Sequence, residues 1–130
     1  MTNEHAARPS ARFEGEAGLL DLEHEASDLL EQSVGSRHGH AQHTLYRYAG
    51  VTIAMFALQE NAALPRHAAD GVVSVHVLRG QITINAGATR FDLPAGRLVR
   101  MEPRVAHDVR ASTPSVILLH IARVNSDEQG

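Results

Sequence analysis

The chain has 130 residues, which fits one domain able to bury a core without cross-links, and its net charge is −3. It contains no cysteine. This excludes disulfide bonds and thiolate metal sites, so a bound metal would need histidine, carboxylate, backbone or water as ligands. The mild negative charge and the absence of a basic cluster argue against nucleic-acid binding, and the apolar runs are too short to span a membrane.

The N-terminal third predicts a tail, a helix and a linker ahead of the main domain. Residues 1–16 are polar, and we expect a flexible tail there. Residues 17–43 are expected to hold an amphipathic helix over 17–32, with Asp21 as its cap, followed by a linker. The first ten residues lack the apolar core of a secretion signal, so we expect a cytoplasmic protein.

The expected linker contains a cluster of three histidines, His38, His40 and His43. Their spacing could pass for a metal motif. However, a glycine separates the first two, and no acidic residue lies close to them in sequence. The sequence therefore argues against a native metal here and leaves the role of the cluster open.

From residue 44 onward the apolar residues recur with a period of two, which is typical of strands. Many short strands with closely spaced turns and no helices between them predict an antiparallel β-barrel or sandwich over residues 44–124. Residues 125–130 are expected to form a C-terminal tail. The expected strands are 44–48, 51–59, 72–78, 81–85, 89–92, 97–100, 107–111 and 116–123.

Three residues are expected to adopt the left-handed backbone conformation at turns. Gly80 ends a strand and begins the return of a hairpin, and Gly96 follows Pro-Ala at a corner. Asn61 also stands at a turn, and asparagine tolerates this conformation better than most residues.

Two histidines, His67 and His107, lie in turn contexts that resemble the two motifs of the cupins. In that family the first motif is H-x-H, three or four residues, E, six residues, G. The second is G, five residues, P-x-G, two residues, H. The resemblance covers residues 44–124 and implies an all-β fold, the double-stranded β-helix or jelly-roll barrel of the RmlC-like cupins, here with a short N-terminal helix.

The resemblance also implies a metal site, but only part of the ligand set is present. His67 and His107 match the first and third histidines of the motifs, whereas Ala69 and Val73 stand where the second histidine and the glutamate belong. His76 is a further candidate ligand, although strand alternation sends it away from the site unless a bulge intervenes. The resemblance therefore leaves two alternatives, one divalent transition metal (iron, manganese, nickel or zinc) or none.

A pocket for a small molecule is expected between the two motifs, because cavities with apolar walls and a few convergent polar groups are the usual ligand sites. Its expected walls are the apolar residues Met55, Val73, Val75, Val77, Leu98 and Val105.

Three functions remain open from the sequence. The favoured one is a binding or sensing module that holds a small molecule, with or without a weakly bound metal. The alternatives are a metal-dependent, dioxygenase-like cupin enzyme and an isomerase in which one histidine acts as general base. Strands 51–59 and 116–123 are apolar on both faces in places, so we also predict a second buried face, under the helix or in a homodimer.

Overall fold

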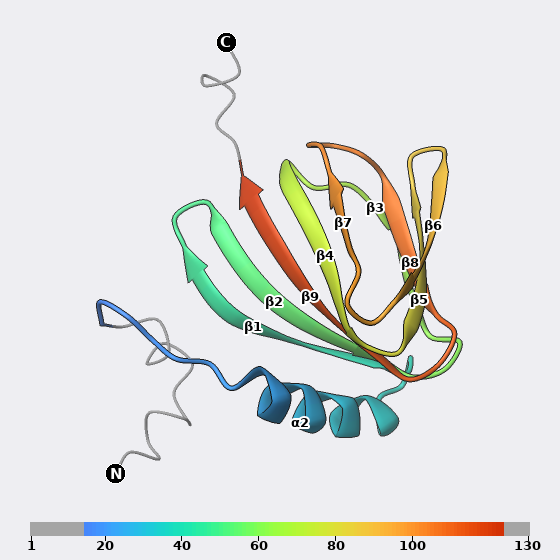
Figure 1. Ribbon diagram of the computed structural model, residues 1–130, viewed down its shortest axis with the longest axis horizontal. Coiled ribbons are helices and arrows are strands. Elements are labelled where there is room, and N and C mark those ends of the chain that lie inside the picture. The colour runs from blue at the N-terminus through green and yellow to red at the C-terminus, as the bar shows by residue number, and fades with distance from the viewer. Residues whose placement is uncertain (1–14, 124–130) are drawn as a thin grey trace.

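Two antiparallel β-sheets and one helix make up residues 15–123, the part of the chain that the computed structural model describes (Figure 1). The tails expected at 1–16 and 125–130 lie almost wholly outside these residues. The elements are α2 (Leu22–Val34), β1 (His40–Tyr48), β2 (Val51–Leu58), β3 (Ala63–His67), β4 (Gly71–Arg79), β5 (Gln81–Ala86), β6 (Thr89–Pro94), β7 (Leu98–Met101), β8 (His107–Ala111) and β9 (Ser115–Arg123).

The sheets form two layers. The five-stranded sheet has the order β1-β2-β9-β4-β7, and the four-stranded sheet has the order β3-β8-β5-β6. Neighbouring strands run antiparallel throughout both sheets. The all-β jelly-roll architecture predicted from the short, closely punctuated strands is therefore confirmed.

Strand alternation gives the five-stranded sheet an inner face, toward the other sheet, and an outer face. On β4, Val73, Val75 and Val77 are buried and pack in the core between the sheets. Val72 and His76 alternate with them and lie on the outer face. The same alternation continues on β9 and β2, so each of these strands contributes to two separate apolar layers.

The space between the sheets differs from one side to the other. In what we term the closed half, β4 and β7 face β5 and β6, and buried side chains such as Val77, Ile82, Ile84 and Met101 fill the interior. In the open half, β1, β2 and β9 lie opposite β3 and β8, and the side chains leave a pocket between them. This difference positions the candidate site.

Helix α2 covers part of the outer face (Figure 1). Asp21 caps its first turn as expected, since the carboxylate accepts a hydrogen bond from the His24 backbone N–H at 3.1 Å. Ala26 and Leu29 are buried against outer-face residues that include Leu45 and Met55. The predicted second buried face therefore lies partly under this helix.

Two edge strands differ from the sequence-based expectation. Strand β1 begins at His40, so residues 40–43 belong to the sheet and not to a linker. Strand β3 was not among the expected strands, and it contains Pro65, although proline removes a ladder donor. Proline is tolerated here because β3 pairs only with β8 and lies at the sheet edge.

The expected left-handed residues are present, with φ values of 87° at Gly80, 70° at Asn61 and 92° at Gly96. Gly80 is also closely packed, because a Cβ at this position would collide with Oγ of Ser115 and the Pro114 carbonyl. Only glycine satisfies both constraints at this hairpin.

Candidate functional site

The structure brings His67 and His107 together at one end of the pocket. His67 is the last residue of β3 and His107 is the first residue of β8, and the two are direct partners in the antiparallel register. Their ring centroids are 4.4 Å apart, with 57° between the ring planes. Two segments forty residues apart in sequence thus present adjacent imidazoles.

The hydrogen bonds of both rings fix which nitrogen stays free. Nδ1 of His67 lies 3.0 Å from the Pro65 carbonyl oxygen, and Nδ1 of His107 lies 3.1 Å from the Val105 carbonyl oxygen. A carbonyl only accepts, so each Nδ1 carries the proton and donates it. Each Nε2 is therefore left with a lone pair, which is the usual arrangement of a histidine that binds a metal or accepts a hydrogen bond.

The two histidines differ in exposure. His107 is only 3% exposed and lies on the inner face of the four-stranded sheet, whereas His67 is exposed at the end of an edge strand. The pair therefore lies at the boundary of the pocket, with the His107 ring on the buried side and the His67 ring on the solvent side.

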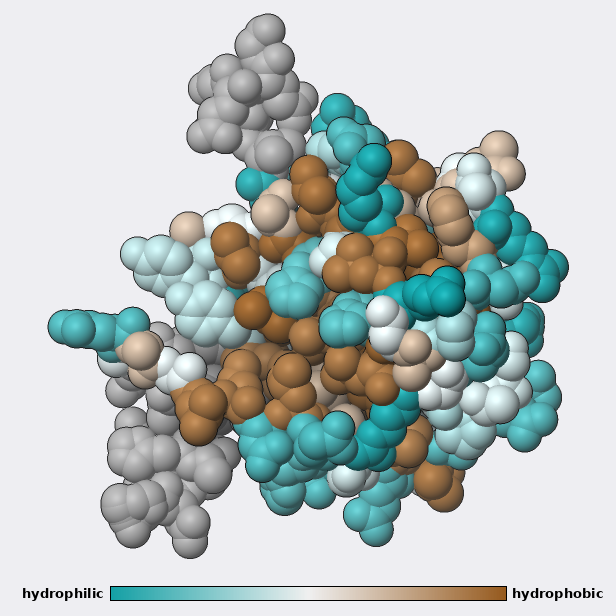
Figure 2. Space-filling view, viewed as in Figure 1, coloured by the Kyte–Doolittle hydropathy of each residue, from teal (hydrophilic) through white to brown (hydrophobic). Residues whose placement is uncertain are grey.

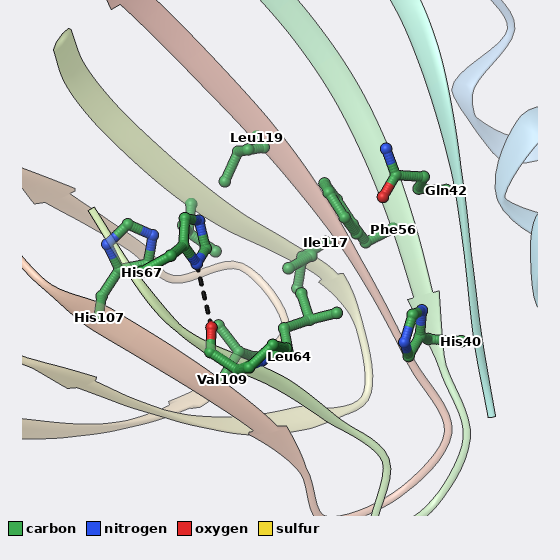
Figure 3. Close-up of a pocket in the computed structure, with 11 residues that line it drawn as sticks. His40, Gln42, Phe56, Leu64, His67, His107, Val109, Ile117 and Leu119 are labelled. Carbon is green, nitrogen blue, oxygen red and sulfur yellow. Dashed lines mark hydrogen bonds between the residues drawn. The ribbon is translucent and has the colours of Figure 1, made fainter. Parts of the chain in front are cut away.

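The pocket is a cavity of about 270 Å³ between the two sheets (Figure 3). Most of its wall is apolar, and its polar groups are three imidazoles and one amide. Its lining residues are His40, Gln42, Phe56, Leu64, Pro65, His67, Val75, His107, Val109, Ile117 and Leu119.

Of the six residues expected to form the pocket wall, Val75 lines it. Val73 and Val77 share its inner face but are buried in the core between the sheets, and Val105 packs against that core from the loop before β8. Met55 and Leu98 require correction, because both lie on the outer face. Met55 is fully buried in the layer under α2, and Leu98 is 53% exposed.

His76 also lies on the outer face, so it does not join the two pocket histidines. It pairs with Leu98 on β7 and Leu118 on β9, and no bulge intervenes between Val73 and His76. Within residues 15–123, no group of three histidines or carboxylates is close enough to hold a metal. The protein ligands available at this end of the pocket are two imidazoles.

Sequence reasoning missed His40 and Gln42, which line the pocket from β1. His40 pairs with Leu58 and Gln42 pairs with Phe56. Both partners lie on the inner face of β2, which places His40 and Gln42 there too. Extending the two-residue period of β1 back to residue 40 was the signal that could have found them.

Asp108 follows His107 but faces away from the pocket, on the outer side of the four-stranded sheet. A hydrogen bond from the Asn85 amide at 2.9 Å lowers the pKa of the Asp108 carboxyl below its usual value, and the Arg66 guanidinium at 3.2 Å lowers it further. This network orders the backbone at the start of β8, beside His107.

Within residues 15–123, no helix is both long enough and apolar enough to cross a lipid bilayer.

The sequence matches no protein-family model and no curated protein. Solved structures, however, share its architecture. A conserved protein of unknown function from Streptococcus pyogenes superposes with a TM-score of 0.68 at 20% identity, covering 87% of this chain and 93% of that one. A cupin superfamily protein from Desulfitobacterium hafniense gives a TM-score of 0.65 at 14% identity, covering 87% and 96%. The chain has the cupin fold.

An RmlC-like cupin from Shewanella frigidimarina aligns with a TM-score of 0.63 at 18% identity, covering 70% of this chain and 82% of that one. Identities this low establish the fold and leave the chemistry to the residues of this chain. The resemblance stated from the two histidine motifs is thus confirmed at the level of the cupin architecture.

Proposed function

We propose that this cupin-fold protein binds a small molecule in the pocket of the open half, with His67 and His107 as its principal polar contacts. The observation that carries the proposal is that two adjacent imidazoles, whose Nδ1 atoms are held by backbone carbonyls, line one end of a cavity with apolar walls. Cavities that combine an apolar lining with a few fixed polar groups are the usual small-molecule sites.

The same pair of imidazoles would suit one weakly held divalent metal. Imidazole nitrogen binds iron, manganese, nickel and zinc, and the Nδ1 bonds to backbone carbonyls orient both rings as metal ligands usually are. Because no third histidine or carboxylate among residues 15–123 groups with this pair, water or the small molecule would complete the coordination. A metal bound there would act as a Lewis acid toward an oxygen atom of the ligand.

A metal-dependent enzyme, dioxygenase-like or an isomerase, is the second candidate function. The observation that favours it is the unequal exposure of the pair, since His107 is shielded while His67 reaches solvent. A shielded imidazole with a free Nε2 can also serve as a general base. In either kind of enzyme, the substrate would have to bind in the pocket before the metal or the general base acts on it.

We further propose a homodimer formed through the uncovered part of the outer face. Tyr48, Val51 and Val72 are exposed at one end of this face, and Leu98 is exposed farther along it on the edge strand β7. Figure 2 shows hydrophobic side chains gathered on the side of the molecule that it presents. An apolar area of this kind is typical of an interaction surface. Sedimentation equilibrium of wild type and Leu98→Arg tests it: a dimer that the substitution dissociates is expected, and a wild-type monomer at micromolar concentration contradicts it.

The experiment that tests the metal part is elemental analysis of untagged protein purified without nickel resin or chelator. We expect less than one metal per chain as isolated, rising toward one with added manganese or zinc, and none in His67→Ala or His107→Ala. His38→Ala is the matched control, because it removes an exposed histidine outside the pocket. Metal uptake that survives both pocket substitutions would place the metal elsewhere.

A further inference from the structure

We infer that the pocket takes a small molecule with an oxygen group at each end and an apolar body between them, and that His40 and Gln42 bind the end remote from the His67–His107 pair. This inference rests on the proposed function, because it specifies what the pocket binds.

The arrangement of the lining gives the pocket two polar ends. Figure 3 shows His67 and His107 at one end and His40 and Gln42 across the cavity. Apolar side chains from β2, β3 and β9 lie between the two ends, among them Leu64. A ligand that spans the cavity therefore meets polar atoms, then apolar surface, then polar atoms again.

The second polar end lies at the open side of the pocket, where His40 is half-buried and Gln42 is exposed to solvent. Within residues 15–123, no side chain or backbone group bonds to the Gln42 amide or to the His40 ring nitrogens. The His40 ring stacks against the His38 ring, with centroids 6.2 Å apart and 21° between the planes. This stack orients the ring and leaves both of its nitrogens available.

The chemistry of this end selects neutral oxygen groups. An amide and an imidazole each offer both a donor and an acceptor, which matches a hydroxyl or a carbonyl. No arginine, aspartate or glutamate is among the lining residues, so nothing there compensates a phosphate or an ammonium group.

The volume sets the size of the ligand. A cavity of about 270 Å³ has room for roughly nine water molecules at about 30 Å³ each, so the ligand has on the order of ten non-hydrogen atoms. A hydroxylated or keto-substituted aromatic or branched aliphatic acid has this size and polarity. Its carboxylate only accepts hydrogen bonds, so it would lie at the His67–His107 end, where a divalent metal held by the two imidazoles would supply the positive charge.

The test compares two probes of equal size, para-hydroxyphenylacetate and para-methylphenylacetate, which differ only in the group remote from the acid. Affinities are measured by calorimetry for wild type, His40→Leu and Gln42→Leu, first with EDTA and then with manganese. His43→Leu is the matched control, because His43 lies on the same strand but faces outward, toward Glu25, and is outside the lining. Binding of the methyl probe verifies in each variant that the pocket is folded.

We expect wild type and His43→Leu to prefer the hydroxyl probe by roughly tenfold, the effect of one or two neutral hydrogen bonds, and both pocket variants to lose that preference. Equal affinity of wild type for the two probes, or a preference that persists in both pocket variants, overturns this inference and leaves the proposed binding function standing. Absence of binding by either probe under both metal conditions contradicts the inference and the proposed function together.

Discussion

The closed and open halves of this barrel are built from the same strand pattern but are used differently. In the closed half, buried aliphatic side chains from both sheets meet and fill the interior. In the open half, the edge strands β1 and β3 bring imidazoles, an amide and a proline to the same inner surface, and a cavity remains. One half of the core therefore serves stability, and the other half is available for a ligand.

The largest expected difference between the halves is in the cost of removing side-chain volume. Ile82→Ala, in the closed half, should lower the free energy of unfolding by about 3 kcal/mol, because the side chain is fully buried and its neighbours cannot collapse. Leu64→Ala, in the open half, should cost only about 1 kcal/mol, because that side chain is half-buried at the pocket. Urea unfolding measures both, and equal losses would contradict the division.

Adding volume should separate the halves in the opposite sense. Val77→Phe should destabilise the closed half by about 1–3 kcal/mol through overpacking. Leu119→Phe should leave stability within about 1 kcal/mol of wild type, because the pocket can accept the added atoms, and should abolish binding of para-hydroxyphenylacetate. Thermal melts combined with calorimetry report both effects, and a Leu119→Phe variant that still binds the probe would count against the pocket.

Motif spacing and strand parity explain what the sequence could predict about the site. His67 and His107 were identified because the turns around them match two motifs of a known fold. Strand alternation predicted that His76 faces away from the site unless a bulge intervened, and the register from Val73 to His76 is regular. Leu98 was assigned to the pocket wall, but its pairing with His76 places it on the outer face.

His40 was missed for a different reason. The start of β1 is rich in histidine and glutamine, which carry little strand signal, and its register becomes evident only from its pairing with β2. The size of the cavity likewise depends on how the two edge strands diverge, which no local pattern encodes.

The smallest expected effect is on the free energy of unfolding and comes from Asp108, whose side chain faces away from the pocket. Because its pKa is lowered in the folded protein, its contribution to stability is present above the unfolded pKa of about 4 and is lost as pH falls through the lower folded value. Asp108→Asn should therefore be slightly less stable than wild type at neutral pH, and the difference should shrink in acid. Urea midpoints measured across this range test the sign.

Ligand binding provides the control for the Asp108 prediction. Asp108→Asn should bind the hydroxyl probe as wild type does at neutral pH, since the carboxyl lies on the far side of β8 from the cavity. A large loss of affinity would show that the outer network and the pocket are coupled.

Methyl NMR during titration with para-hydroxyphenylacetate shows in which half of the barrel the ligand binds, because one spectrum reports on both halves. We predict saturable shifts at Val75, Val109 and Ile117, which line the pocket, and little change at Ile82 and Ile84, which fill the closed half. Shifts spread evenly over both halves, or confined to the outer face around Leu98, would contradict a binding site in the open half.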